Sequence, residues 1–237
     1  MFDLFHSLWL EGLYKPIYNL VIFTYNLTPG PSFGLTIIGL AIFIRFLFLY
    51  FTLLGYKHDE QLTEVKPQIE KIEEDKSLSS REKISKVSAI TKPFGINPFL
   101  VSVPLFAQII FLGVLYQIIQ GGIYSPGYHS LYTFVKFTGP LNTHFFGFDL
   151  AHRNLTLSAA AAFFLFLERV WEYNRRKKIA ENFSQKWDPL IWPAGTFIIL
   201  SVLPSAKAIF VMTSVAFSFT INTIVQISSP KQPVAKA

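Results

Sequence analysis

A single charged residue stands in the middle of an apolar stretch near the start of the chain. Between Pro31 and Tyr56 the only charged side chain is that of Arg45. If this stretch crosses a membrane as a helix, a guanidinium near its centre costs about 2.5–3.5 kcal/mol on insertion scales. A buried counter-ion, backbone carbonyls or a water-filled cavity would offset that cost. The two interpretations that we weigh are an ion pair with Glu168 and a hydrated, positively charged cavity within the bilayer.

Further polar side chains within apolar segments favour the cavity. Gln108 lies midway along a long apolar run, and the last apolar segment carries several hydroxyl and amide groups. From that segment we select Ser214, Ser218 and Asn222 as candidates for the cavity wall. Hydroxyls in membrane helices commonly donate a hydrogen bond to a carbonyl oxygen of their own helix, so a single one is weak evidence for a cavity. Together, these side chains make the last segment the most polar wall available.

None of these residues forms a catalytic or metal-binding arrangement. The five histidines lie outside the apolar segments and have no metal-ligand spacing. No Ser–His–Asp set, phosphate loop or pair of carboxylates occurs within the apolar runs. The sequence therefore predicts a protein that is not an enzyme, with no catalytic residues, no metal and no cofactor.

The composition places these residues in a membrane. Only 15% of the 237 residues are charged and 51% are hydrophobic, whereas soluble domains are roughly 25% charged. Asp, Glu, Lys and Arg are missing from residues 93–135, 154–167, 189–206 and 208–230. Helices of a soluble protein need charged outer faces, so we predict an all-α polytopic membrane protein. The chain contains no cysteine, which excludes disulfides and thiolate metal sites.

Five apolar segments approach the roughly 20 residues that a helix needs to cross the hydrocarbon. The flanks on one side of these segments carry 15 Lys and Arg residues, and those on the other side carry four. Because basic flanks stay in the cytoplasm, the prediction is five transmembrane helices with the N-terminus outside and the C-terminus inside. The formal charge of +6 is explained by this asymmetry, so no sequence-specific nucleic-acid partner is expected.

The predicted segments follow one another along the chain. They are an outer amphipathic interfacial helix (1–32), a first span (33–54), a cytoplasmic helical hairpin (55–97), a second span (98–119), an outer loop (120–154), a third span (155–173), a cytoplasmic loop (174–188), a fourth span (189–203), an outer turn (204–207), a fifth span (208–227) and a cytoplasmic tail (228–237).

The predicted hairpin has its own pattern of apolar residues at spacings of three and four, typical of a narrow helix–helix seam. Ser80, followed by Lys83, is the predicted N-cap of its second helix, without a capping box. The hairpin is either a solvated connector or an arm that docks a cytoplasmic partner, and its length favours the arm. The candidate docking residues are basic: Lys71, Arg81, Lys83, Arg175, Arg176, Lys177 and Lys178.

Several short motifs, in order, resemble the YidC/Oxa/Alb family of membrane protein insertases. They are Gly39-Leu-Ala-Ile-Phe-Ile-Arg45, the charged arm with Val65-Lys-Pro67-Gln-Ile-Glu-Lys-Ile72, then Gly95-Ile-Asn97-Pro98-Phe, Pro104-Leu-Phe-Ala-Gln108, Leu115-Tyr116-Gln117 and Phe145-Phe-Gly-Phe-Asp149-Leu150. The order of an outer helix, a span, a cytoplasmic hairpin and two further pairs of spans matches the family nearly end to end. The chain resembles the short bacterial type, without a large outer domain.

The resemblance implies five helices around a groove that opens to the cytoplasm and to lipid. Arg45 matches the family's groove arginine and Gln108 its second-span glutamine. The implied partners are nascent membrane proteins and the lipid bilayer, with the ribosome, the signal-recognition receptor and the Sec translocon as further candidates. The implied location is the bacterial plasma (inner) membrane, because no transit peptide precedes the first helix.

The chain departs from the family at its last span. There the family often has a Tyr-Trp pair after a Pro-Ala-Gly turn, whereas this chain has Pro204-Ser-Ala-Lys207 and only phenylalanines. The alternative function is that of a small-solute or anion transporter, or its membrane subunit, with Arg45 as the binding charge. Transporters are typically built from inverted repeats, and no internal repeat is visible in this sequence.

Overall fold

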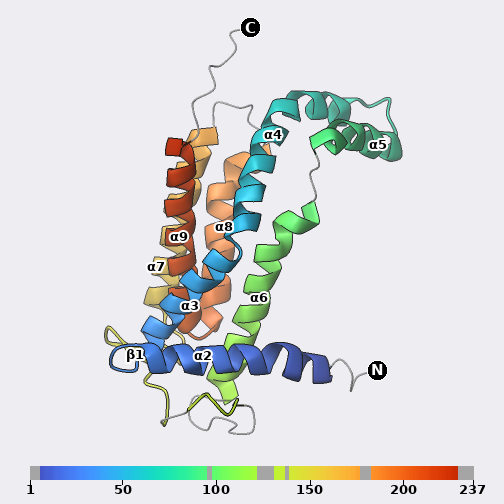
Figure 1. Ribbon diagram of the computed structural model, residues 1–237. Coiled ribbons are helices and arrows are strands. Elements are labelled where there is room, and N and C mark those ends of the chain that lie inside the picture. Colours follow the sequence, from blue (N-terminus) through green and yellow to red (C-terminus); the bar gives the residue numbers. More distant parts are fainter. Residues whose placement is uncertain (1–5, 95–97, 122–130, 137–138, 177–182, 229–237) are drawn as a thin grey trace. The chain divides into compact units, whose positions relative to one another are not determined.

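The computed structural model describes residues 6–94, 98–121, 131–136, 139–176 and 183–228. Helices dominate, as predicted, with a single two-stranded hairpin among the described residues (Figure 1). The elements are η1 (Leu8–Tyr14, a π-helix), α2 (Lys15–Leu27), α3 (Phe33–Leu47), α4 (Leu49–Glu74), α5 (Ser80–Thr91), η2 (Lys92–Phe94, a 3₁₀-helix), α6 (Pro98–Gly121), β1 (His144–Phe145), β2 (Phe148–Asp149), α7 (Leu155–Arg176), α8 (Phe183–Val202) and α9 (Ala206–Ser228).

Two described helices are long and apolar enough to cross a membrane, Ser102–Gly121 and Ala206–Val225. A third span results if Phe33–Leu47 and Leu49–Gly55 count as one segment, which is bent by 58°. The apolar part of α8, Trp187–Val202, is shorter, and the second half of α7 carries charges such as Glu168 and Arg169. Length and composition thus support two or three of the five predicted spans, and the predicted topology is not confirmed.

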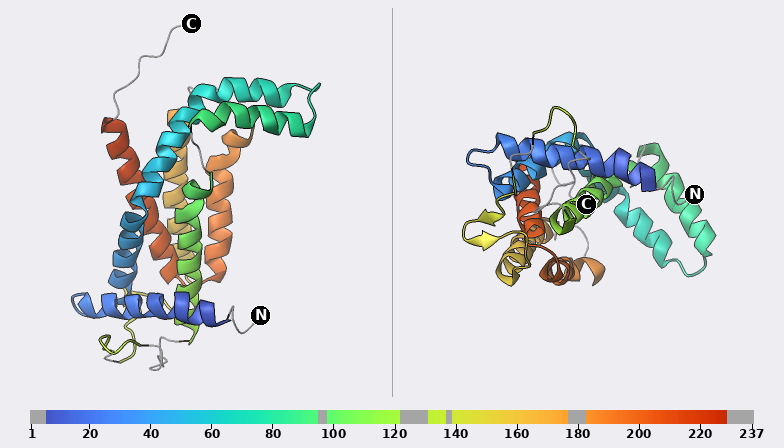
Figure 2. Two further views of the ribbon diagram at one scale, coloured as in Figure 1. Left: turned by 45° about the vertical axis from the view of Figure 1, so that its right-hand side comes forward. Right: turned by 90° about the horizontal axis from the view of Figure 1, so that it is seen from below.

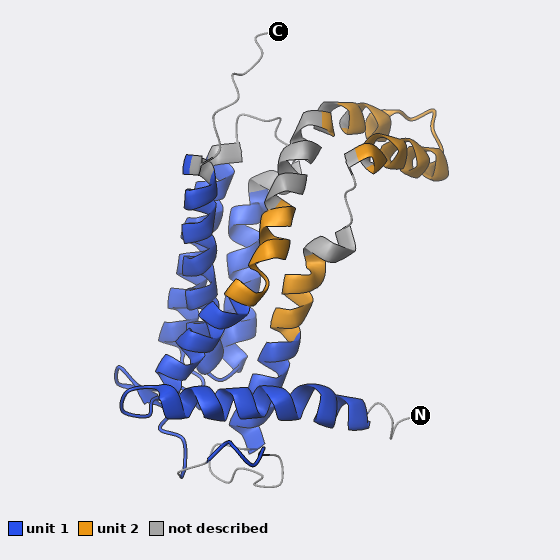
Figure 3. Ribbon diagram, in the orientation of Figure 1, with its two compact units in different colours: residues 1–45, 110–237 blue, residues 46–109 orange. Residues whose placement is uncertain are grey.

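The chain divides into two compact units (Figure 3). Unit 1 comprises residues 1–45 and 110–237, and unit 2 comprises residues 46–109. Unit 1 therefore contains most of α3, the second half of α6 and all of α7, α8 and α9. Unit 2 contains the last residues of α3, the whole of α4 and α5, and the first half of α6.

The buried core of unit 1 gathers at one end of its helices. In α3, the buried residues lie between Phe33 and Ala41, and in α7 between Leu157 and Ala161. The buried residues of α9 are concentrated between Ala206 and Val215. Beyond these points most side chains are half-buried or exposed, so the helices pack tightly at the end that we predicted to face outward and loosely at the other.

Helix α2 covers this packed end. It lies transverse to α7 and α9 in Figures 1 and 2, with Tyr18, Val21 and Ile22 buried. Asn19 fixes it to the outer loop, because its Oδ1 accepts a hydrogen bond from the backbone N–H of Tyr132 at 2.7 Å. The Tyr25 hydroxyl likewise accepts the N–H of Asn142 at 2.7 Å. The amphipathic N-terminal helix is therefore part of the folded core of unit 1.

The hairpin of unit 2 is formed by the far half of α4 and by α5, which pack against each other. The N-cap of α5 is Ser79, in a full capping box with Glu82. Ser79 Oγ accepts the Glu82 N–H, and the Glu82 carboxylate accepts the Ser79 N–H at 2.8 Å. The predicted cap at Ser80 was wrong by one residue, because only Ser79 has a glutamate three positions later to complete the pair.

Candidate functional site

Arg45 lies near the end of α3 and is half-buried. Its charge lies near enough to attract the carboxylate of Glu168 in α7, as does the charge of the adjacent Arg169. The Glu168 carboxylate lies 4.0 Å from Arg169 Nε, and Arg169 also pairs with Glu172 at 3.2 Å. Arg45 and Glu168 thus belong to one electrostatic neighbourhood in which Glu168 is shared with a second arginine.

The three candidate residues of α9 share one face of the helix. Ser214, Ser218 and Asn222 are spaced by four residues, so they form a stripe along it. Ser214 and Asn222 are buried and Ser218 is half-buried. The Ser214 Oγ has no hydrogen-bond partner among the described residues although it is fully buried. A buried hydroxyl left unpaired is costly, which distinguishes this position from its neighbours.

The threonines of the same helix are satisfied within it. Thr213, Thr220 and Thr223 each donate to the carbonyl oxygen four residues earlier, at 2.8–2.9 Å. Their hydroxyls therefore need no partner outside α9. The polar character of this helix is thus concentrated on the stripe of Ser214, Ser218 and Asn222.

The other predicted residues are distributed over both units. Gln108 is half-buried on α6 and belongs to unit 2. Lys71 and Arg81 are exposed on the hairpin, and Lys83 Nζ donates to the carbonyl oxygen of Glu73. Arg175 and Arg176 end α7, but their side chains lie outside the described residues, as do Lys177 and Lys178 entirely.

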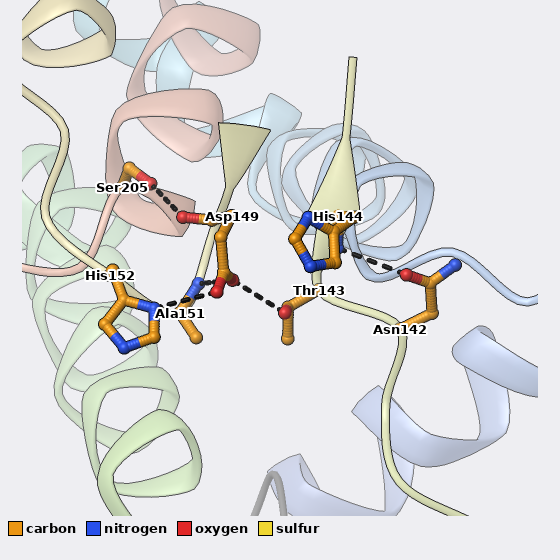
Figure 4. Close-up of polar contacts among 7 residues, drawn as sticks. All are labelled: Asn142, Thr143, His144, Asp149, Ala151, His152 and Ser205. Carbon is orange, nitrogen blue, oxygen red and sulfur yellow. Dashed lines mark hydrogen bonds and ion pairs between the residues drawn. The ribbon is translucent and has the colours of Figure 1, made fainter. Parts of the chain in front are cut away.

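A hydrogen-bonded contact that the sequence did not predict closes the packed end of unit 1 (Figure 4). Strands β1 and β2 pair antiparallel, and the turn between them places Phe146 and Gly147 at φ values of 47° and 81°. The Asp149 carboxylate accepts hydrogen bonds from Thr143 Oγ1 at 2.7 Å and the Ala151 N–H at 3.0 Å, and pairs with His152 Nδ1 at 2.8 Å. Asp149 thus holds the short hairpin in shape.

This hairpin in turn binds the turn between α8 and α9. The backbone N–H groups of Ser205 and Ala206 donate to the carbonyl oxygens of His152 and Leu150 at 2.9 and 3.1 Å. Ser205 Oγ donates to the carbonyl oxygen of Asp149 at 3.2 Å. We call this set of bonds the loop–turn contact. It satisfies the N–H groups at the start of α9 and ties the outer loop to that helix.

The Asp149 carboxyl makes the loop–turn contact sensitive to acid. Burial raises its pKa, but the hydrogen bonds from Thr143, Ala151 and His152 outweigh burial and hold the pKa below its usual value. A carboxyl group whose pKa is lower in the folded protein than in the unfolded chain stabilises the fold. This stabilisation is complete above the pKa of the unfolded chain, about 3.9, and is lost as the pH falls through the pKa of the folded protein.

We therefore expect the unfolding temperature of the protein to fall more steeply below about pH 4 in the wild type than in the variant Asp149→Asn. Thermal unfolding in detergent between neutral and acidic pH measures this difference. Equal slopes for the two proteins would show that Asp149 does not govern the acid response.

The sequence analysis also missed Lys207 as a buried group. Its side chain is only 6% exposed, and its Nζ lies 4.4 Å from the centre of the Tyr116 ring, in the geometry of a cation–π contact. A signal for it was present, because Lys207 is the only charged residue between Pro189 and Pro230.

Two comparisons with known proteins indicate the family of the chain. The family model described as "60Kd inner membrane protein" matches residues 23–232, which include Arg45, Gln108 and α9. The membrane protein insertase YidC of Oleidesulfovibrio alaskensis (strain ATCC BAA-1058 / DSM 17464 / G20) is 31% identical over 110 residues. That alignment covers 46% of this chain and 20% of the relative, so the two share about a fifth of the relative's length.

Proposed function

Because the chain belongs to the 60Kd inner membrane protein family, that is, the YidC/Oxa/Alb family, we propose that it is a membrane protein insertase. It acts as a non-enzymatic chaperone for nascent membrane proteins in the bacterial plasma membrane. Its five helices cross that membrane with the N-terminus outside and the C-terminus inside. The relative that matches it is an insertase by name, which supports this assignment.

The observation that carries the proposal is the half-buried arginine in an otherwise apolar helix. Arg45 attracts the carboxylate of Glu168, which also lies 4.0 Å from Arg169 Nε. A guanidinium in an apolar helix also attracts other acidic groups that come near it. The acidic N-terminal tail of a nascent membrane protein supplies such a group.

The distribution of buried residues supports a groove that opens toward the cytoplasm. The core of unit 1 is dense at the loop–turn contact and sparse toward Arg45. The stripe of Ser214, Ser218 and Asn222 supports a polar lining, because it runs from the dense core toward the sparse end and Ser218 on it is half-buried.

The mechanism follows from these groups. The tail of the substrate enters the groove from the cytoplasm, and Arg45 attracts its carboxylates while Ser214, Ser218 and Asn222 of the same unit offer hydrogen bonds. The tail then crosses a shorter hydrocarbon barrier, and the apolar segment of the substrate moves sideways into lipid. Binding and local solvation lower the barrier, so no nucleotide is needed. The ribosome, the signal-recognition receptor and the Sec translocon are the candidate sources of substrate.

Reconstitution into liposomes tests the proposal. The purified protein is mixed with a newly made single-span protein that bears a short acidic N-terminal tail, and protease protection of the tail is measured. We expect protection well above that of empty liposomes. Protection no greater than in empty liposomes, with a folded sample, would contradict an insertase. A flux of small anions in the same vesicles would then favour the transporter.

A further inference from the structure

One face of α5 combines basic side chains with an exposed isoleucine. Arg81, Ile84, Ser88 and Lys92 follow one another at spacings of three and four residues, which places them on one side of a helix. Lys92 continues the helix, since its backbone is still helical (φ −55°, ψ −42°). All four side chains are exposed, Ile84 by 70%. We call these four residues the outer face of α5.

The outer face is not the side that packs against α4. Lys83 donates to the Glu73 carbonyl oxygen at the end of α4, and Lys83, Val87 and Ile90 are half-buried, whereas the other described side chains of α5 are exposed. The hairpin therefore holds α5 with the outer face directed away from α4. A single exposed isoleucine is ordinary on a protein surface, but here it lies between Arg81 and Lys92.

The charges of the hairpin are separated between its two helices. Residues 80–92 contain four basic side chains and one acidic side chain, Glu82, whose carboxylate is engaged in the Ser79 capping box. The acidic side chains Glu73, Glu74 and Asp75 are exposed together at the end of α4. The positive charge of α5 is thus left without a carboxylate partner on its own outer face.

We propose that the outer face of α5 binds anionic phospholipid headgroups at the cytoplasmic surface of the membrane. Arg81 and Lys92 match lipid phosphates, and Ile84 enters the boundary between headgroups and acyl chains. RNA would also attract the two basic side chains through its phosphates, but its backbone offers no apolar environment for Ile84. The lipid surface accounts for both kinds of side chain.

The connection of α5 to α6 supports this partner. Lys92 precedes the first residue of α6, Pro98, by six residues, which span at most about 20 Å. Helix α6 contains one of the two membrane-span candidates, so the outer face is tethered close to the membrane surface. The inference is independent of the insertase activity and requires only that the chain be in a membrane.

Nitroxide labels on the full-length protein test the inference. The chain has no cysteine, so Ser88→Cys labels the outer face alone. Ala89→Cys is the matched control, because residue 89 is also exposed but points about 100° away around the helix. Each labelled protein is placed in vesicles of phosphatidylcholine, with and without phosphatidylglycerol. The collision rates of the label with oxygen and with a water-soluble nickel complex are then compared.

We expect phosphatidylglycerol to raise the oxygen-to-nickel ratio at residue 88 by about threefold or more, with little change at residue 89. High salt and the double variant Arg81→Gln/Lys92→Gln should each reverse the rise. Helix content and substrate insertion are measured on the same samples, so that misfolding and failure of the insertase are recognised separately.

Equal ratios at residue 88 in both kinds of vesicle would overturn the proposal. An equal rise at residues 88 and 89 would also overturn it, because contact would then not be confined to the outer face. A response to added ribosomes in phosphatidylcholine, without one to phosphatidylglycerol, would assign the face to RNA instead.

Discussion

Replacement of Arg45 by alanine is expected to lower the protected insertion of a substrate with an acidic N-terminal tail by about tenfold or more. The reason is electrostatic, since an attraction of about 1.4 kcal/mol between the guanidinium and a carboxylate changes a binding constant tenfold. Arg45→Lys keeps the charge and should retain most of the activity. It loses the planar pair of donors, so a modest decrease is expected. The measurement is protease protection in liposomes.

Two controls separate a substrate-binding role of Arg45 from a structural one. Arg153→Ala removes an exposed arginine of the outer loop and should leave insertion unchanged. Glu168→Gln removes the carboxylate that Arg45 attracts. If Arg45 served mainly to pair with Glu168, this variant would lose as much activity as Arg45→Ala. Insertion unaffected in Arg45→Ala would contradict the role that we assign to the charge.

A substrate series gives an independent check on Arg45. When the acidic residues of the substrate tail are replaced by glutamine, wild type and Arg45→Ala should insert it equally. The difference between the two proteins should grow with the number of carboxylates in the tail. A loss that is the same for acidic and neutral tails would indicate damage to the fold.

The second large effect is expected from Asp149→Ala, which should destabilise the protein by about 2–4 kcal/mol. The substitution removes the acceptor for Thr143 Oγ1 and for the Ala151 N–H, and Thr143 is only 6% exposed. Both donors lose their partner, and the loop–turn contact loses the hairpin that positions it. Thermal unfolding in detergent measures the loss of stability.

Graded variants show which bonds of Asp149 matter. Asp149→Asn keeps an oxygen that accepts from Thr143 and Ala151, so it should be less destabilising than the alanine variant. His152→Ala removes a partner whose side chain is 72% exposed and should cost under about 0.5 kcal/mol, as surface pairs usually do. Arg153→Ala, at an exposed position of the same loop, is the neutral control. If all these variants unfolded at the same temperature, Asp149 would have no special part in the contact.

The span prediction shows where sequence patterns are strong and where they are weak. Long uncharged runs identify α6 and α9 as membrane-span candidates, because the cost of charge in hydrocarbon leaves few sequences that fit. The same rule is less decisive for α7 and α8. Helix α7 carries Glu168 and Arg169, and the apolar part of α8 extends only from Trp187 to Val202. Their place in the membrane depends on neighbouring helices, which a hydropathy window does not include.

Local sequence signals predict where a helix begins, but they do not predict the contacts of its side chains. The start of α5 was predicted to within one residue, and Glu82 decided between Ser79 and Ser80. The sequence could not predict which hydroxyls of α9 bond to their own helix, because Ser214 and Thr213 are similar polar residues at adjacent positions. Only the structure shows that Thr213 bonds to its own helix while Ser214 Oγ is buried without a partner among the described residues.

The sequence by itself determined the helical class, the membrane character and the resemblance to a family, and it singled out Arg45 for the proposed role. These follow from composition, from spacing along one helix and from the cost of a charge in lipid, which are all local properties. The tertiary structure alone decided which distant groups meet. Asp149 reaches Ser205 across 56 residues, and Lys207 lies over Tyr116 although 91 positions separate them. No periodicity relates such pairs, because their contact depends on how helices and loops pack in three dimensions.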